Sequence, residues 1–491
     1  MLLVAGFVLG DGVAPAGRRL AKVTGIDPTG YFGVSHAMLF HQNFNLAEEY
    51  QHVKPAENSW TQPQPETGHY GSVWAVGYSI LAAPFLGAGT LLDALTGRPA
   101  DGYSHFAILG FCLTNVVLTG LGLMALFSFT LNVADFWNIA PRAAAYFALF
   151  TTAATFLGTT VGYYAFSPMA HAAEFFWANL FLAYWWRVRE RIDVRGWVFL
   201  GFLGGFLSIT RWQDIFFLAA PILADALGGA SGLVARIRSR IAYVAAAAFC
   251  WIPQVLEWKY IYNRFLTIPQ GSGFFTFPPS VVQNVLFSTR SGWIAWTPLV
   301  LLGLCGLIWG GRRQPRLWLP WMVVVLLEVC LIGSSPASWH GGDGFGARYL
   351  TSLTAPISLG LVTLLCLAAR NVRPLIVGAA LACCLFSVVS AVEFRLDLIP
   401  HADRLTVSEY FTDKFRPLQV RRRKQLVRQA EALLSQGSPS AAVTVLEAVA
   451  ADGPDRDVLA ELSKAYRASG REPDARNADW RLAMLMRSRL F

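Results

Sequence analysis

The residues best suited to chemistry lie close together near position 340. They read Trp339-His340-Gly341-Gly342-Asp343-Gly344-Phe345-Gly346-Ala347-Arg348-Tyr349. The four glycines let the backbone approach a ligand closely. Arginine can bind a phosphate group through two parallel hydrogen bonds. We therefore predict that His340, Asp343 and Arg348 converge on a ligand, with Arg348 on a phosphate group. A plain turn is the alternative, but the pattern is too specific for one.

A second candidate is the carboxylate of Asp27, which is followed by Pro28. A carboxylate just outside a membrane span can act as a general base, taking a proton from an acceptor hydroxyl while a phosphate leaves. The alternative is structural, because Asp-Pro is a good helix start and Asp27 would cap that helix. Glu48 and Glu49 form a second acidic pair with a weaker claim to this chemistry.

Further ionisable residues fall at the ends of apolar segments. His171 and Glu174 are spaced to share one helix face, and Arg211 and Asp214 flank a tight hairpin between two apolar runs. Arg290 lies in a polar segment before a later run. Ionisable groups at membrane depth are costly and are often functional. Mutual ion pairing is the structural alternative.

The composition indicates what kind of protein must position these residues. The chain has 491 residues, of which 54% are hydrophobic and only 14% are charged, whereas soluble domains carry about 25% charged residues. This excludes a disordered chain, a disulfide-stapled module and an ordinary soluble enzyme. The seven cysteines all fall inside apolar runs and show no metal-ligand spacing, so we expect small core residues and no metal site there.

Apolar runs of nearly the length of a membrane span recur along the chain. We predict spans at 105–129, 141–163, 170–186, 196–210, 213–228, 241–256, 292–310, 317–334, 350–369 and 374–394. The opening run, residues 1–13, lacks the features of a signal peptide and is interpreted as the end of a first span. This gives about eleven transmembrane helices. The segment 73–95 is long enough for a twelfth.

The distribution of arginine decides the orientation. The loops near 130–142, 187–195, 229–240, 311–316 and 370–373 hold thirteen arginines and three acids. Positive loops stay in the cytoplasm, and these five alternate properly if 105–129 is the second span and 73–95 does not cross. We therefore predict a long first extracytoplasmic loop, residues 15–104, in which 73–95 is a re-entrant or interfacial helix. The net charge of +9 thus reflects topology, and no nucleic-acid partner is expected.

The carboxyl-terminal part has a different pattern. After a linker at 396–420, apolar residues in 421–491 recur at helical spacing in segments of roughly 12 residues, separated by glycine and proline. Two helix pairs spaced by about 34 residues resemble tetratricopeptide repeats. We expect this small helical domain to dock on the membrane domain or on a protein partner. A helical tail without a binding role is the alternative.

Residues 1–395 resemble the GT-C superfamily of membrane glycosyltransferases, and in particular a bacterial branch related to the protein O-mannosyltransferases and lipid A aminoarabinose transferases. The matching pieces are Asp27 with Tyr31, Glu48-Glu49-Tyr50, Pro84-Phe85, Asp101 to Ser104, Ser167 to His171, Leu286 to Gly292 and the 339–349 loop. The family often has two adjacent acids early in the first loop, whereas Asp27 stands alone here.

The resemblance implies an all-α bundle that transfers a sugar, with inversion, from a polyprenyl-phosphate donor. Asp27 would be the base, and Arg348, Arg290 and Arg211 would hold the phosphate. The sugar or acceptor pocket would be lined by His340, Asp343 and His171. The predicted substrate-binding set also includes Tyr31, Glu48, Glu49, Trp339 and Tyr349.

The expected setting is the bacterial inner membrane, with the active-site loops outside the cytoplasm and a glycan, lipid or protein of the cell envelope as acceptor. No cofactor is expected, and a bound divalent metal ion is the alternative. Two other functions stay open as well. One is a transporter or flippase of lipid-linked glycans, and the other is a non-catalytic scaffold that recruits a partner through its tail.

Overall fold

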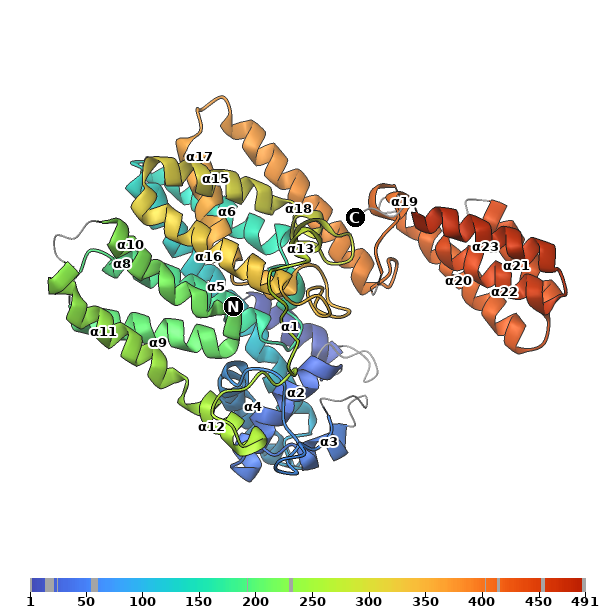
Figure 1. The fold of residues 1–491 in the computed structure, drawn as a ribbon, viewed down its shortest axis with the longest axis horizontal. Helices are drawn as coiled ribbons and strands as arrows, with labels where there is room; N and C mark the ends of the chain where they lie inside the picture. Colours follow the sequence, from blue (N-terminus) through green and yellow to red (C-terminus); the bar gives the residue numbers. More distant parts are fainter. Residues whose placement is uncertain are drawn as a thin grey trace.

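The computed structural model describes residues 2–13, 22–23, 25–53, 61–191, 193–228, 233–401, 403–412, 416–451 and 455–487. Within these ranges the structure contains helices and no strands, which confirms the predicted all-α class. Figure 1 shows a large bundle with a smaller group of helices beside it.

The amino-terminal helices are α1 (Leu2–Val13), α2 (Ile26–His36), the π-helix η2 (Ala37–His41), α3 (Ala47–Val53) and α4 (Gly77–Leu95). The first half of the bundle consists of α5 (His105–Phe136), α6 (Pro141–Gly158), α7 (Val161–Tyr164), α8 (His171–Val188) and α9 (Val194–Thr210). These are followed by the 3-10 helix η3 (Trp212–Leu218), α10 (Ala219–Leu227), α11 (Leu233–Cys250) and α12 (Ile252–Tyr262).

The second half consists of α13 (Val282–Phe287), α14 (Trp293–Trp296), α15 (Leu299–Arg313), α16 (Pro315–Gly333), the 3-10 turn η4 (Arg348–Leu350), α17 (Thr354–Leu367) and α18 (Arg373–Arg395). The tail contains α19 (Val407–Phe411), α20 (Pro417–Ser435), α21 (Pro439–Ala451), α22 (Arg456–Ala468) and α23 (Glu472–Arg487).

Among the residues that the structure describes, five helical segments are long and apolar enough to cross a membrane. They are Gly77–Leu95, His105–Phe136, Arg236–Tyr262, Pro315–Gly333 and Arg373–Arg395, and Val194–Thr210 and Thr354–Leu367 are shorter apolar helices. Gly77–Leu95 is the segment predicted to lie in the first outer loop. Its length and composition would also suit a span, so its interfacial placement stays a prediction, as does the total of eleven.

The predicted spans are interrupted more often than the apolar runs suggest. Residues 141–163 divide into α6 and α7, and residues 292–310 divide into α14 and α15 before and after Pro298. The run 213–228 begins as the 3-10 helix η3 and continues as α10. Each break interrupts the regular helical backbone within a predicted span.

Glycines allow several of these helices to touch backbone to backbone. A Cβ atom on Gly306 of α15 would lie 1.8 Å from the carbonyl oxygen of Gly360 in α17, and one on Gly201 of α9 would lie 2.2 Å from that of Tyr243 in α11. Close approach through small residues is the usual way in which membrane helices associate, because lipid offers no hydrophobic drive for their packing. Glycine at these positions therefore sets the helix spacing.

We expect Gly306→Val to destabilise the bundle by about 1–3 kcal/mol or more, since the added methyl groups must push α15 away from α17. Thermal unfolding of the purified protein in detergent measures the effect. Gly378→Val in α18 is the matched control, because a Cβ at Gly378 meets nothing within 4 Å. Equal stability of the two variants would contradict the proposed close packing.

Large apolar residues are exposed on the outer surface of the bundle. Leu375 of α18 is 74% exposed and Met124 of α5 is 68% exposed. By contrast, the amino-terminal helices α2, α3 and α4 gather with α12 at one end of the bundle (Figure 1), where Thr67 donates a hydrogen bond to the carbonyl oxygen of Ile261 (2.5 Å). The first loop is thus packed against the end of the bundle.

The orientation of this end can be tested with introduced thiols. We expect Gln62→Cys, in the first loop, to react with an impermeant maleimide in intact cells, and Gln314→Cys, in an arginine-rich loop, to react only after permeabilisation. Both glutamines are exposed. Cys305, the exposed native thiol among the described cysteines, is replaced by serine in both variants and in the blank. Labelling of Gln62→Cys only after permeabilisation would reverse the predicted orientation.

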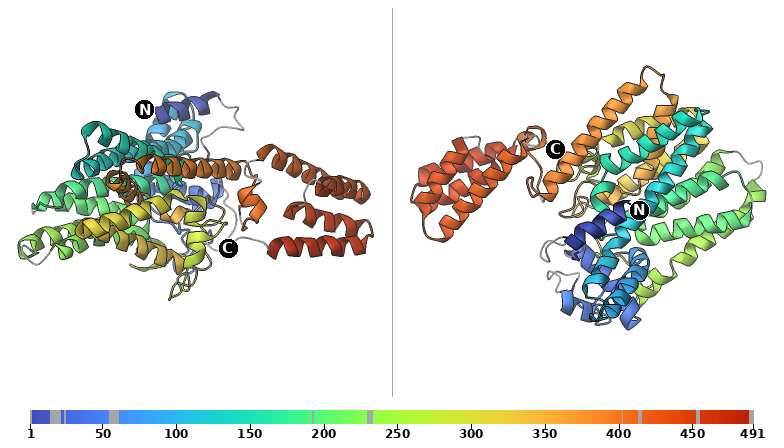
Figure 2. Two further views of the ribbon diagram at one scale, coloured as in Figure 1. Left: turned by 90° about the horizontal axis from the view of Figure 1, so that it is seen from above. Right: turned by 180° about the vertical axis from the view of Figure 1, so that it is seen from behind.

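The tail helices α20 to α23 pack in sequence around their own small core, which includes Ala430, Leu446 and Leu462. The views in Figure 2 show this group standing apart from the bundle, to which it is connected through α18 and α19. The repeat resemblance and the docking role of the tail stay predictions.

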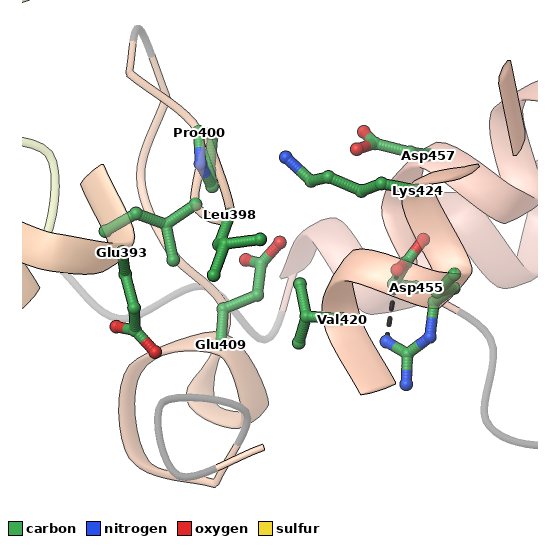
Figure 3. A pocket seen from close by; sticks show the side chains of 10 residues that line it. Glu393, Leu398, Pro400, Glu409, Val420, Lys424, Asp455 and Asp457 are labelled. Carbon is green, nitrogen blue, oxygen red and sulfur yellow. Dashed lines mark hydrogen bonds and ion pairs between the residues drawn. The ribbon is translucent and has the colours of Figure 1, made fainter. Parts of the chain in front are cut away.

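A small hollow lies where the tail meets the bundle. It is lined by Glu393, Glu409 and Lys424 among others, and the ion pair between Arg423 and Asp455 borders it (Figure 3). Its volume is only about 20 Å³. That is room for roughly one water molecule, so this hollow is no substrate site.

Candidate functional site

A close ion pair in the bundle joins Asp27 to Arg348. An Asp27 carboxylate oxygen lies 2.6 Å from a terminal nitrogen of Arg348, with the two side chains 18% and 9% exposed. Asp27 lies in the first turn of α2, whose amino-terminal end makes no side-chain capping bond. The capping alternative for Asp27 is therefore wrong, because its carboxylate is turned toward the guanidinium.

The glycine-rich loop is shaped around Arg348. A Cβ on Gly341 would lie 2.8 Å from Arg348 Nε, and one on Gly344 would lie 2.8 Å from Arg348 Cδ. Gly341 also has a φ of 69°, which disfavours other residues. These two glycines thus give the arginine side chain its space, whereas the sequence suggested that they admit a ligand.

Arg348 is held as a cation. Burial alone would lower its pKa, but the Asp27 carboxylate and the hydroxyl groups of Tyr349 and Tyr164 raise it above the ordinary value. A terminal nitrogen also contacts Met169 Sδ at 3.4 Å. Arg348 Nε has no hydrogen-bond partner among the described residues, so this guanidinium keeps a donor available.

A second guanidinium lies nearby. Arg211 Nε is 3.5 Å from Glu174, and a terminal nitrogen is 3.4 Å from both ring nitrogens of His171. Glu174 also accepts a hydrogen bond from the backbone N–H of Ser352 at 3.0 Å. The sequence placed Asp214 beside Arg211, but the ion pair that the structure shows for Arg211 is with Glu174. The helix-face pairing of His171 with Glu174 is present at 3.2 Å.

Tyr349 links the two cations. The guanidinium carbon of Arg211 lies 4.9 Å from the centre of the Tyr349 ring, and that of Arg348 lies 5.4 Å from it. Tyr31 completes the group, and burial raises the pKa of its hydroxyl well above the usual range. Tyr31 therefore stays a neutral hydrogen-bond donor beside the charged residues.

Tyr31, Arg211 and Tyr349 are part of the lining of a cavity of about 350 Å³. Its other walls are mainly aromatic and aliphatic, and they come from the first loop, the 211–215 turn, residues 266–275 and the end of α16. The lining includes Tyr31, Trp74, Arg211, Trp212, Gln213, Trp251, Trp258, Leu266, Phe274, Phe275, Leu331 and Tyr349. A mostly apolar cavity with a few polar groups in its lining is typical of a ligand site.

The remaining predicted residues lie elsewhere. The His340 ring accepts a hydrogen bond from the Gly342 N–H at 3.0 Å and packs against Trp339. Burial, and then the charge of Arg290, lower the pKa of His340, so it is neutral at pH 7. Asp343 is exposed, and no ion pair joins it to Arg348 in the described part of the chain.

The acidic pair on α3 is divided between two environments. Glu48 is exposed, whereas Glu49 is fully buried against His36 and His41. Neither glutamate lines the aromatic cavity. The nitrogens of the two histidines and an oxygen of Glu49 lie within 4.8 Å of one another, close enough to hold a metal ion.

The sequence did not single out the cavity walls. Trp74, Trp212 and the segment 266–275 were missed because they carry no charge and match no motif. The clustering of Trp212, Trp251 and Trp258 near predicted loops was a usable signal, since tryptophan favours membrane interfaces.

The chain was compared with known proteins. No family model matches it, and no curated protein matches it. Two crystal structures of ArnT from Cupriavidus metallidurans are similar, each at 14% sequence identity and a TM-score of 0.47. The apo structure is matched over 97% of this chain and 76% of ArnT, and the structure bound to undecaprenyl phosphate over 96% and 77%.

Proposed function

We propose that this chain is a membrane glycosyltransferase of the GT-C type. It would transfer a sugar from a polyprenyl-phosphate donor to a cell-envelope acceptor outside the cytoplasm. The observation that carries the proposal is the gathering of one carboxylate and two guanidinium groups around Tyr31 and Tyr349, which line an aromatic cavity.

The charges of this group suit the reaction. Asp27 takes the proton of the acceptor hydroxyl as the acceptor oxygen forms its bond to the sugar carbon. The bond from that carbon to the phosphate oxygen breaks, and the phosphate gains one negative charge. Asp27 is now neutral, so Arg348 loses its counter-charge at the moment when the phosphate needs it. Direct displacement with a single base gives inversion at the sugar carbon.

The cavity suits the lipid half of the donor. A prenyl chain is apolar, and burying it against Trp212, Trp251, Phe274 and their neighbours is favourable at roughly 25 cal/mol per Å². Arg211 lines this cavity, and both Arg211 and Arg348 lie against the ring of Tyr349. A phosphate bound beside this ring would therefore meet both cations. Arg290 is the third phosphate-binding residue of the proposal.

The sugar and the acceptor would lie on the far side of the phosphate. We assign His171, His340, Asp343 and Trp339 to this region as a proposal that rests on the family resemblance. Glu174 is a positioning residue in this scheme, because it holds Arg211 and the backbone of Ser352.

The setting is also proposed. The chain would lie in the bacterial inner membrane with residues 1–395 as the catalytic domain, 396–420 as a linker and 421–491 as a repeat-like domain that recruits a protein partner. The active-site loops, 15–104 among them, would face away from the cytoplasm.

Mass spectrometry of cell-envelope glycans, with and without the protein, tests the function. We expect one sugar modification to disappear when the protein is absent and to return with the wild-type chain. Asp27→Asn, expressed at the same level, should not restore it. Restoration by Asp27→Asn would exclude Asp27 as the base and would favour a transporter or a scaffold.

A further inference from the structure

We propose that His36, His41 and Glu49 form a site for one divalent transition metal ion, with Zn²⁺ as the best match. The site lies in the first loop, apart from Asp27 and Arg348, and it does not depend on the proposed function. One ligand atom from each of the three residues lies within 4.8 Å of the other two. We did not predict this site from the sequence.

The tautomer of His36 argues for a cation. Its Nε2 lies 2.8 Å from the backbone carbonyl oxygen of Asp101, which can only accept a hydrogen bond, so Nε2 carries the proton. In a neutral ring, Nδ1 is then a lone pair, and it lies 3.0 Å from Glu49 Oε1. Two acceptors at this distance repel each other unless a proton or a metal ion lies between them.

A second imidazole converges on the same oxygen. His41 Nε2 lies 3.5 Å from Glu49 Oε1 and 3.3 Å from Glu48 Oε2. The other oxygen of Glu49 is buried and has no hydrogen-bond partner among the described residues. Two imidazole nitrogens and a carboxylate, with Glu48 or water as a fourth ligand, form a tetrahedral set that Zn²⁺ prefers.

The backbone is arranged so that the two histidines can meet. In an α-helix, residues five apart point about 140° away from each other, at 100° per residue. The segment Ala37–His41 is instead a π-helix, with backbone bonds between residues five apart. This places the rings of His36 and His41 with their centres 5.6 Å apart. Single π-helical turns occur frequently at functional sites.

The surroundings fix the orientation of His36. Its ring lies between Phe40, with ring centres 4.3 Å apart, and Tyr103, at 4.4 Å. Gly102, with a φ of 79°, allows the loop to close over the ring, since a Cβ there would lie 2.6 Å from His36 Cδ2. Metal-binding histidines usually donate their second N–H to a carbonyl or carboxylate, as His36 does to Asp101.

The site would hold the first loop together. His36 ends α2 and Glu49 lies in α3, while the Asp101 carbonyl belongs to the segment before α5. Asp27 is nine residues earlier in α2, about 13 Å away along the helix axis. The ion would therefore be a structural clamp on the helix that carries Asp27, and it would not touch the reacting groups.

Metal analysis of the purified full-length protein tests the site. The protein in detergent is stripped with a chelator, incubated with ZnCl₂ and freed of excess metal by gel filtration. We expect about one zinc per wild-type chain, and a loss of at least tenfold in retained zinc in His41→Ala and Glu49→Gln. His52→Ala is the matched control, because His52 is exposed and stacks on Tyr103 in the same loop.

Stability and spectroscopy separate a metal site from simple ion pairs. ZnCl₂ should raise the Tm of the wild type and of His52→Ala but leave that of His41→Ala unchanged, and Co²⁺ should give the visible absorption of a four-coordinate nitrogen and oxygen site. His41 is partly exposed, so its variant should fold even if Glu49→Gln does not. A wild-type chain that neither retains zinc nor gains stability from it would overturn the proposal. His36 and His41 would then be imidazolium groups paired with Glu49.

Discussion

Replacing Asp27 with asparagine should reduce sugar transfer by roughly a hundredfold or more, the usual scale for loss of a general base. The side chain keeps its size and one oxygen acceptor for Arg348, but it can no longer take a proton. Transfer by purified protein in lipid vesicles measures the effect. Asp27→Glu, which keeps a carboxylate, should retain more activity than Asp27→Asn.

Stability must be recorded beside activity, because Asp27 is paired with a buried cation. Removing one partner of a buried ion pair costs about 3–5 kcal/mol when no acceptor is left, and we expect a smaller loss with asparagine. Asp397→Asn, an exposed residue of the same type, is the control and should transfer normally. Normal transfer by Asp27→Asn at normal Tm would show that Asp27 is structural.

The second large effect is expected at Arg348. Lysine keeps the positive charge but lacks the planar guanidinium group that can donate two hydrogen bonds to one phosphate. Hydrogen bonds to charged groups contribute about 1.5–3 kcal/mol to the free energy of the interaction. Arg348→Lys should therefore weaken the binding of polyprenyl phosphate by roughly tenfold to a hundredfold, with one decade for each 1.4 kcal/mol. Binding of polyprenyl phosphate to the purified protein in detergent gives the affinity.

The matched control for this variant is Arg395→Lys. Arg395 is exposed at the carboxyl end of α18 and lies 4.9 Å from the Tyr163 ring, away from the Asp27 pair. Its affinity for polyprenyl phosphate should equal that of the wild type. If Arg348→Lys also kept the wild-type affinity for polyprenyl phosphate, the role of Arg348 would be limited to its ion pair with Asp27.

Part of the site could be predicted from residue types. Asp27 was selected as a carboxylate just outside a span, and Arg348 as an arginine in a glycine-rich loop. Arg211 and His171 were selected because ionisable groups at membrane depth are costly. Their partners could not be predicted, because the Asp27–Arg348 contact joins residues that are far apart in the sequence. The sequence gives no distance across such a separation.

The errors have physical causes. Gly341 and Gly344 were expected to admit a ligand, but glycine is equally suited to making room for a protein side chain. The meeting of His36 and His41 was not predicted, because an α-helical register would keep them apart and no local signal marks the π-helix. The all-α class was predictable, since each apolar run has the length and composition of a helix.

Transfer and translocation can be separated in one reconstituted system, and this is the most direct test of the central claim. Purified protein in vesicles is given a panel of polyprenyl-phosphate sugars, each with a radiolabelled sugar, together with an extract of cell-envelope acceptors. We predict that the wild type moves label from one donor to an acceptor and releases polyprenyl phosphate, while Asp27→Asn and Arg348→Lys do so far more slowly. Movement of the intact labelled lipid across the bilayer, with no transfer of the sugar, would contradict the glycosyltransferase assignment.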